Sequence, residues 1–451
     1  MRPDAAGIGI GAEITMMDGT AISDVLDDTF VWAHEALGTD HTERLQQLRY
    51  ATRRPLGESV DVTFQNPGSP DAQTVTLDTI SERQSFMFSS FNAGISGNEL
   101  PVEFEILPSG YGYVSIFSFS DDEYLTVQLW ERMIRTFKSA EVPGIIVDMR
   151  NNGGGSGYLA DQLSAYFFND DSIFAGNTGT YSEELDDFYF DDRGRDILYL
   201  PPEDLRYQGP VSVIITPACF SACEFFSYNL TLQERAEIVG HYPTGGLGGS
   251  VSDFYMPEGV TVRFTVGRAV DNDGNIHIEG KGVPPTIDVP VDEETLFAED
   301  ALLDAAELAL TESIRGKIVN AGTLSFGETG LGTLSATGTI QPGESVEYAV
   351  TLRAGTVVSF YAGDETGNVD TILSIYDETG GTLLVDNDDA SDETRNSALE
   401  ALGVGTTDLK IIVAVSLGDG EESAADYFIQ LEAVADTDED GDGEPDRSNE
   451  G

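Results

Sequence analysis

The spacing of hydrophobic residues first indicates a small α+β region over residues 1–88. Residues 60–64 alternate between apolar and polar side chains, as a half-buried strand does. Residues 42–54 carry a partly apolar helical face, and the Pro- and Gly-containing stretch 66–71 is typical of a turn. These features predict short strands packed against a helix.

The pattern then changes to alternating strands and helices over residues 89–315. Residues 145–147 and 211–215 are almost wholly apolar, as strands buried on both faces of a parallel sheet must be. An apolar stripe at helical spacing precedes the first of them, made of Leu125, Leu129, Met133 and Phe137. A further helix is expected over 300–314. The region is therefore predicted to be an α/β domain.

The last third of the chain is predicted to be all-β. Residues 346–352 alternate strictly, and turns separate short strands over 335–435, as in a β-sandwich. The Gly- and Thr-rich stretch 316–334 is interpreted as a linker. Residues 436–451 form an acidic tail.

The net charge of the chain excludes one class of partner and indicates the kind of environment in which the protein works. The 451 residues include 80 acidic and 23 basic side chains, with a formal net charge of −57. Such a field repels nucleic acid, which we exclude as a partner. A protein from a salt-adapted, halophilic source is the preferred interpretation, with an ordinary acidic secreted protein as the alternative. No apolar run is long enough to span a membrane, and the first residues show no signal peptide.

The two cysteines and the acidic tail each allow two interpretations. The chain has two cysteines, Cys219 and Cys223, which we expect to be small buried residues; a local disulfide between them is the less favoured alternative. In the tail, three acids at every second position could bind a structural Ca²⁺ ion: Asp438, Asp440 and Asp442. The spacing does not fit an EF-hand, and a solvated tail is the competing interpretation.

Candidate chemistry lies at the ends of the two buried strands. Ser221 follows the strand 211–215 and opens a helix, so its hydroxyl and the amide of Ala222 meet at a helix N-terminus. The other strand leads into the loop 148–155, which contains three consecutive glycines. An exposed nucleophile beside an N–H donor suits acyl transfer, although a serine at this position is more often only a helix cap. Phosphate binding is set aside because the Lys-Ser/Thr of a P-loop is missing.

Four motifs in order resemble the tail-specific, or C-terminal processing, serine peptidases. Their counterparts here are Asp148 to Gly155, Cys219 to Glu224, Arg235 to Gly240, and Gly280 to Pro285. The resemblance covers roughly residues 110–290 and implies a crotonase/ClpP-like peptidase core. Residues 1–88 resemble the later part of that family's PDZ domain, which is expected to be incomplete at its N-terminus. Residues 335–435 resemble a bacterial pre-peptidase C-terminal domain.

The resemblance implies roles for individual residues. Ser221 would be the nucleophile, and the amides of Ala222 and Gly154 would form the oxyanion hole. Backbone contacts to substrate are expected from four further glycines, Gly153, Gly155, Gly245 and Gly246. Many members place a catalytic lysine where Gly246 stands here, so a Ser-Lys dyad is not expected.

The tricorn-like branch of that family uses Ser-His-Glu instead of a dyad. Its glutamate corresponds to Glu279, expected on a strand. Its histidine lies ahead of the PDZ domain, so we expect the base to belong to an N-terminal segment absent from this chain. His241, on the loop where the lysine would otherwise lie, is the candidate within the chain.

The leading hypothesis is a serine endopeptidase that acts on unfolded proteins or their C-terminal tails through an acyl-enzyme. It would require no cofactor, bind polypeptide substrates and work outside the cell or in the periplasm. The alternative is a non-catalytic peptide-binding or surface-adhesion protein with the same fold. An esterase is disfavoured because the chain has no G-x-S-x-G elbow. The sequence does not indicate an oligomeric state.

Overall fold

A computed structural model gives the architecture of the chain. It describes residues 6–31, 38–81, 99–169, 173–191, 193, 195–378, 380, 383–390, 394–418, 421 and 423–436. The chain forms two compact units, which are described separately. Unit 1 comprises Met1–Ile106 and Tyr111–Glu307, and unit 2 comprises Leu107–Gly110 and Leu308–Gly451.

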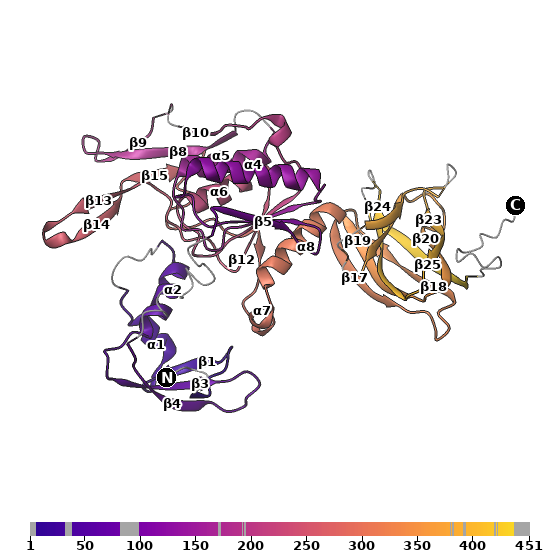
Figure 1. The fold of residues 1–451 in the computed structure, drawn as a ribbon, viewed down its shortest axis with the longest axis horizontal. Helices are drawn as coiled ribbons and strands as arrows, with labels where there is room; N and C mark the ends of the chain where they lie inside the picture. The colour runs from indigo at the N-terminus through magenta and orange to yellow at the C-terminus, as the bar shows by residue number, and fades with distance from the viewer. Residues whose placement is uncertain are drawn as a thin grey trace. The chain divides into compact units, whose positions relative to one another are not determined.

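The N-terminal part of unit 1 is an antiparallel sheet with two helices (Figure 1). The strand order is β2-β1-β3-β4, with bounds β1 (Glu13–Met17), β2 (Thr20–Ala21), β3 (Ser59–Gln65) and β4 (Gln73–Asp78). The helices are α1 (Ile22–Asp27) and α2 (Asp40–Ala51). Thr39 caps α2 by accepting a hydrogen bond from the Thr42 N–H, which is why this helix begins two residues before the predicted start.

A six-stranded sheet is the centre of unit 1. Its order is β16-β12-β11-β7-β6-β5, and only the β5–β6 pair is antiparallel. The strands are β5 (Val102–Ile106), β6 (Gly112–Ile116), β7 (Ile145–Asp148), β11 (Val211–Ile214), β12 (Glu237–Gly240) and β16 (Ile287–Asp288). Every residue of β7 and β11 is buried. The predicted α/β arrangement with apolar central strands is confirmed.

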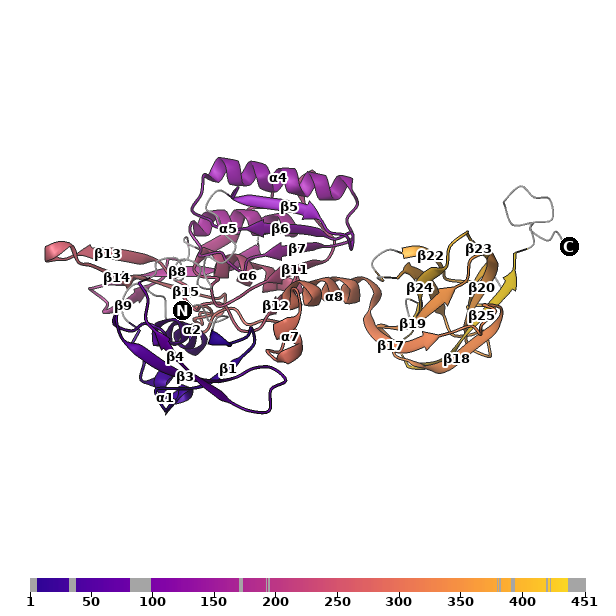
Figure 2. The same cartoon turned by 60° about the horizontal axis from the view of Figure 1, so that its bottom comes forward.

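Three helices accompany this sheet: α4 (Glu123–Ser139), α5 (Gly157–Ser164) and α6 (Ala222–Thr231). Figure 2 shows α4 beside the strands β5, β6 and β7. The predicted apolar stripe of α4 is only partly the buried one, because Met133 and Phe137 are fully buried whereas Leu125 is 40 % exposed. Trp130 takes part in the core instead, with its ring edge-on to Phe226 of α6.

Smaller elements complete unit 1. A second sheet joins β10, β8 and β15 in that order, with β9 paired to β8. Their bounds are β8 (Ile173–Ser182), β9 (Asp187–Tyr189), β10 (Arg195–Leu198) and β15 (Gly267–Val270). A hairpin of β13 (Val251–Tyr255) and β14 (Thr261–Thr265) extends away from the six-stranded sheet (Figure 1). The helices α7 (Glu293–Phe297) and α8 (Ala301–Arg315) follow.

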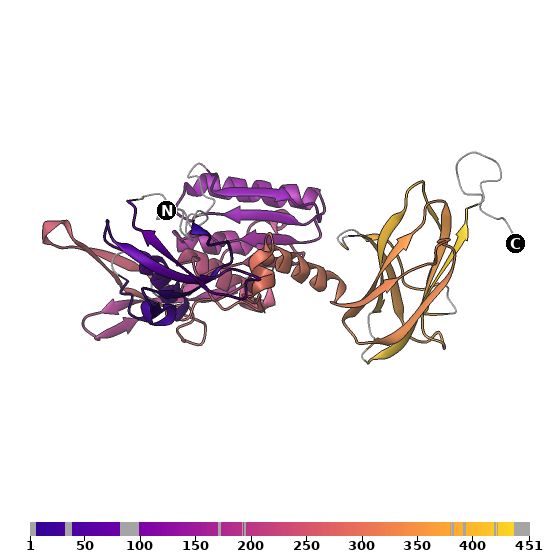
Figure 3. The same ribbon diagram turned by 90° about the horizontal axis from the view of Figure 1, so that it is seen from below.

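Unit 2 consists of two sheets that enclose one apolar core, visible as two layers in Figure 3. The five-stranded sheet has the order β17-β19-β24-β21-β22 and the four-stranded sheet β18-β25-β20-β23. The bounds are β17 (Lys317–Leu324), β18 (Gly332–Ile340), β19 (Glu344–Leu352), β20 (Thr356–Gly363), β21 (Thr371–Asp377), β22 (Leu383–Asn387), β23 (Ser397–Val404), β24 (Leu409–Leu417) and β25 (Ala425–Ala435).

The stretch 316–334 differs from the predicted linker. It contains β17 and the beginning of β18, which pair with β19 and β25. In β18 glycine and threonine make up most of the strand, and in β17 the apolar residues Ile318 and Val319 are adjacent, so neither segment shows a regular apolar–polar alternation over its whole length. Backbone hydrogen bonds to neighbouring strands decide the conformation here, and local composition does not reveal them.

Candidate active site

Ser221 lies on a sharp turn between β11 and α6. Its backbone has φ 53° and ψ −118°, a left-handed conformation that side chains rarely adopt. Ala222 is the first residue of α6, and its N–H has no backbone acceptor among the described residues. The turn therefore presents the Ser221 hydroxyl at a helix N-terminus, next to an unpaired N–H donor.

The glycine-rich loop after β7 packs directly against this turn. A Cβ atom added to Gly154 would lie 2.8 Å from Ser221 Cβ and 3.0 Å from the Ala222 nitrogen. Gly154 also has φ +88°, which favours glycine. The structure thus brings together Ser221, Ala222 and Gly154, which the sequence analysis assigned to one site.

Hydrogen bonds hold the glycine loop in place. Asn152 donates from its side chain to the Ile116 carbonyl at 2.9 Å, and its Oδ1 accepts from the Gly154 N–H at 2.8 Å. The Phe119 N–H donates to the Gly154 carbonyl at 2.9 Å. The Gly154 N–H, expected in an oxyanion hole, is therefore engaged by Asn152 here. Gly153 and Gly155 are exposed on the same loop.

A buried carboxylate connects the serine turn to the loop after β12. Glu224 Oε1 accepts from the Thr244 hydroxyl at 2.6 Å and the Gly246 N–H at 2.7 Å. Its Oε2 accepts from the N–H groups of Leu247 at 2.8 Å and Ser221 at 3.0 Å. Burial raises the pKa of Glu224 to about 7, against the opposing effect of these four donors. Sequence analysis noted Glu224 as part of a motif but did not find this role, because its partners are distant in sequence.

Gly245 and Gly246 use their N–H groups inside the protein. Gly245 donates to the Cys219 carbonyl at 2.9 Å, and Gly246 donates to Glu224. A Cβ atom on Gly245 would lie 2.0 Å from the Phe220 ring. Both N–H groups are used in contacts within the protein. They are therefore not free to bind a substrate, contrary to what the sequence analysis expected of these two glycines.

The two cysteines form a disulfide, which corrects the prediction of separate buried residues. Cys219 and Cys223 are bonded, with their Cα atoms 5.4 Å apart. Both are fully buried, and no free cysteine is left in the chain. The turn at Ser221 shortens the distance between positions four residues apart to one that a disulfide can bridge. This conformation could not be inferred from the spacing.

His241 and Glu279 are not joined to Ser221 by any hydrogen bond among the described residues. His241 Nδ1 lies 2.8 Å from the Val289 carbonyl. A carbonyl only accepts, so Nδ1 carries the proton and Nε2 is left as an acceptor.

Glu279 is half-buried, and burial raises its pKa while Arg268 opposes the increase. It lies on a turn and not on the predicted strand, because Gly280 and Gly282 have positive φ and reverse the chain. The nearby Lys281 is engaged with the Ile276 carbonyl at 2.7 Å.

A cavity of about 700 Å³ opens along the same strand ends. It is lined by Arg150 and Asn151 after β7, by Thr216 to Ala218 after β11, and by α2 through residues such as His41 and Leu45. The Arg150 guanidinium pairs with Asp148 at 2.7 Å and Asp300 at 2.8 Å. These bonds outweigh the effect of burial and raise the pKa of Arg150, so the cavity wall keeps a fixed ion pair.

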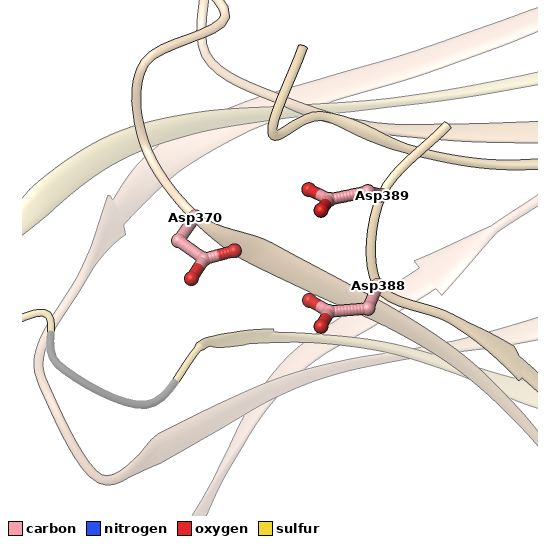
Figure 4. Close-up of side chains that lie close together, drawn as sticks. All are labelled: Asp370, Asp388 and Asp389. Atoms are coloured by element: carbon pink, nitrogen blue, oxygen red, sulfur yellow. The ribbon is translucent and has the colours of Figure 1, made fainter. Parts of the chain in front are cut away.

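One group of carboxylates in unit 2 has a geometry that could hold a metal ion. Oxygen atoms of Asp370, Asp388 and Asp389 lie within 4.8 Å of one another, as Figure 4 shows. Burial and the neighbouring Asp388 raise the pKa of Asp370. Exposed acidic groups often cluster without an ion, and we assign no metal here. The tail residues Asp438, Asp440 and Asp442 lie outside the described residues.

Comparisons with known proteins relate part of the chain to one peptidase family. Residues 110–289 match the family profile of Peptidase family S41. The carboxy-terminal processing protease CtpB of Bacillus subtilis (strain 168) is 23 % identical over 300 residues, which cover 63 % of this chain and 55 % of CtpB. The chain thus spans about half the length of this curated relative.

Two solved structures are among those to which the chain is similar. Mature CPAF has a TM-score of 0.49 and 18 % identity, and the match covers 67 % of this chain and 76 % of CPAF. The photosystem II D1 C-terminal processing protease has a TM-score of 0.36 and 17 % identity, with 69 % and 70 % covered.

The serine turn, the glycine loop and the strands β7 and β11 that lead into them thus lie within the residues that match this family profile. Residues 110–289 are thus similar to peptidase family S41, and a longer stretch of the chain is similar to a carboxy-terminal processing protease. Among the described helices, none combines the length and the apolar character needed to cross a bilayer.

Proposed function

We propose that this protein is a serine endopeptidase that hydrolyses peptide bonds of unfolded proteins or C-terminal tails. The observation that supports the proposal is the packing of Gly154 against the Ser221 turn, where the serine is followed by the N–H of Ala222 at the N-terminus of α6. An acyl-transfer enzyme needs both groups there. The match of residues 110–289 to the profile of Peptidase family S41 supports the same reaction class.

In the proposed reaction, Ser221 Oγ attacks the scissile carbonyl and loses its proton to a base. The Ala222 N–H stabilises the oxyanion, and a second donor comes from the glycine loop once a substrate carbonyl competes with Asn152 for the Gly154 N–H. Water then hydrolyses the acyl-enzyme. His241 is the base proposed within the chain, because its Val289 contact leaves Nε2 free to accept a proton.

Labelling with a fluorophosphonate probe tests the proposal. Wild-type protein is expected to be labelled and to cleave casein, and Ser221→Ala is expected to lose both activities. His241→Ala is expected to lower the rate of both reactions by about 10²- to 10⁴-fold, as loss of a general base does. Absence of labelling in wild type, tested at low and high salt, would overturn the peptidase proposal. An unchanged rate in His241→Ala would assign the base to another group.

A non-catalytic peptide-binding or adhesion protein is the second candidate. It is favoured by the lack of any hydrogen bond, among the described residues, between the Ser221 hydroxyl and a histidine or lysine side chain. Saturable binding of an unfolded polypeptide by a protein that no fluorophosphonate labels would support it.

The flanking regions are assigned on their resemblance. We propose that the first 88 residues are a PDZ-like module that holds an extended peptide, and that residues 335–435 are a pre-peptidase C-terminal domain. Export to the periplasm or the cell exterior is proposed from the Cys219–Cys223 disulfide, since disulfides persist in oxidising compartments. Adaptation to high salt is proposed from the net charge of −57.

A further inference from the structure

The Cys219–Cys223 disulfide closes a small ring through the candidate nucleophile. Ser221 is the middle residue of the five that the bond encloses. Both cysteines are fully buried, whereas Ser221 is partly exposed. The bond therefore lies beneath the turn and leaves the hydroxyl accessible from the other side.

Each end of the ring is fixed to a different element. The Cys219 carbonyl accepts from the Gly245 N–H at 2.9 Å, which ties it to the loop after β12. Cys223 belongs to the first turn of α6, and its N–H donates to the Phe220 carbonyl at 3.0 Å. The disulfide thus joins the loop that leaves β11 to the helix that follows Ser221.

The strained backbone of Ser221 is the reason why the disulfide between its neighbours matters. A non-glycine residue at φ 53° and ψ −118° is strained, and it persists only when its surroundings hold it. Relaxation of the turn would move Oγ away from the Ala222 N–H and from Gly154. A covalent bond between the residues on either side of the strained segment prevents the two ends from separating, and so excludes relaxed conformations.

We propose that the Cys219–Cys223 disulfide is a positioning element for peptide hydrolysis, which keeps the Ser221 turn in its reactive conformation. This inference rests on the proposed function. Reduction by a dithiol such as dithiothreitol converts the S–S bond into two thiols, and the dithiol becomes a cyclic disulfide. The reduced turn then relaxes, so turnover falls while substrate binding elsewhere on the protein is retained.

The direct test is the double variant Cys219→Ala/Cys223→Ala, compared with wild type in casein cleavage and fluorophosphonate labelling. We expect kcat and the labelling rate to fall about 10- to 100-fold, with KM within about twofold, because a displacement of about 1 Å in a reacting group has an effect of this size. The control is Leu230→Ala, a buried change later in the same helix, which lowers stability without touching the ring. It should leave kcat unchanged at temperatures where it is folded.

Reduction of wild type provides the second measurement, which also covers a double variant that does not fold. Wild-type protein reduced in mild denaturant and then returned to buffer should lose activity and regain it on reoxidation, with both thiol states verified by mass. The double variant, where folded, should not respond to the reductant. Equal kcat in wild type and double variant, or full activity of the reduced wild type, would overturn the positioning role and leave the peptidase proposal standing. A wild type that the probe does not label contradicts the proposed function instead.

Discussion

At the scale of single residues, the distance between Gly154 and the Ser221 turn leaves no room for a side chain. A Cβ atom at this position would lie 2.5 Å from the Phe220 carbonyl oxygen, and the backbone has φ +88°. Both effects oppose any residue other than glycine. The loop and the turn must therefore separate if Gly154 is replaced.

We expect Gly154→Ala to lower kcat/KM for casein by about 10²-fold or more, because the oxyanion donors move relative to Oγ. Gly157→Ala is the matched control, since an added Cβ there meets nothing within 4 Å and Gly157 begins helix α5. The kinetics of both variants should be measured beside their thermal unfolding. Retention of wild-type kcat/KM in Gly154→Ala would show that the loop contact is dispensable.

Glu224 is the second residue whose replacement gives a sharp prediction. In Glu224→Gln the amide NH₂ faces two donors, either Thr244 and Gly246 or Leu247 and Ser221, so two of the four hydrogen bonds are lost. The free energy of unfolding should fall by about 1–3 kcal/mol through unpaired buried groups. Chemical denaturation measures it, with the exposed Glu234→Gln as control.

The pH dependence of this variant adds an independent check. Folding raises the pKa of Glu224 from 4.5 to about 7, so the folded protein binds more protons between these values. The contribution of Glu224 to stability is then present at low pH and is lost as pH rises from 4.5 to about 7. The difference in stability between wild type and Glu224→Gln should shrink over this range; a constant difference would contradict the raised pKa.

Sequence analysis found some of these residues and not others, for physical reasons. Ser221 and the glycine loop can be predicted from the sequence because each follows a buried strand and precedes a helix, which is a local pattern. The contacts of Glu224 with Thr244 and Gly246 depend on how two loops meet, which no local pattern encodes. The disulfide is only the less favoured alternative from the sequence, because a spacing of four residues does not reveal the unusual turn at Ser221 between the cysteines.

At the scale of elements, the region after β15 folds over α6 and buries a histidine. The His277 ring centroid lies 4.1 Å from that of Tyr228, and neither ring nitrogen has a hydrogen-bond partner within the part of the chain that the structure describes. Burial lowers the pKa of His277 from 6.5 to about 4. The unfolded chain therefore binds a proton at His277 more readily than the folded chain does. The free energy of unfolding consequently decreases as pH falls from 6.5 towards 4.

We expect His277→Phe to raise the unfolding free energy by about 1 kcal/mol, because it removes two buried polar atoms without partners. The gain should be larger at pH 5 than at pH 8, where the imidazole is neutral in both states. Denaturant titrations at the two pH values measure it. An equal gain at both, or a loss, would contradict burial of a neutral ring.

Elements were predicted best where their side chains are bulky. The strands β7 and β11 are apolar throughout and were placed to within a residue. The strand β18 is rich in glycine and threonine, and the apolar residues of β17 do not alternate regularly, so their sequences predict a linker instead of strands. Pairing with β19 and β25 stabilises them, so tertiary contacts override their composition.

At the scale of the whole molecule, charge is the dominant feature. A net charge of −57 disfavours the folded state through self-repulsion, and salt screens this repulsion over a length that falls from about 10 Å at 0.1 M to about 3 Å at 1 M. We expect the thermal midpoint to rise between 0.1 M and 2 M sodium chloride. Differential scanning calorimetry measures it, and a midpoint that stays level or falls would contradict a salt-adapted fold.

The disulfide at Cys219–Cys223 has a practical consequence for anyone who prepares this protein. Expression in a reducing bacterial cytoplasm would yield the dithiol form, which passes size and purity checks yet, under our proposal, turns over slowly. A preparation judged inert by such an assay would then be wrongly classed as a pseudoenzyme. Secretion of the recombinant chain, or oxidative refolding before assay, is the appropriate route to material that carries the disulfide of the native protein.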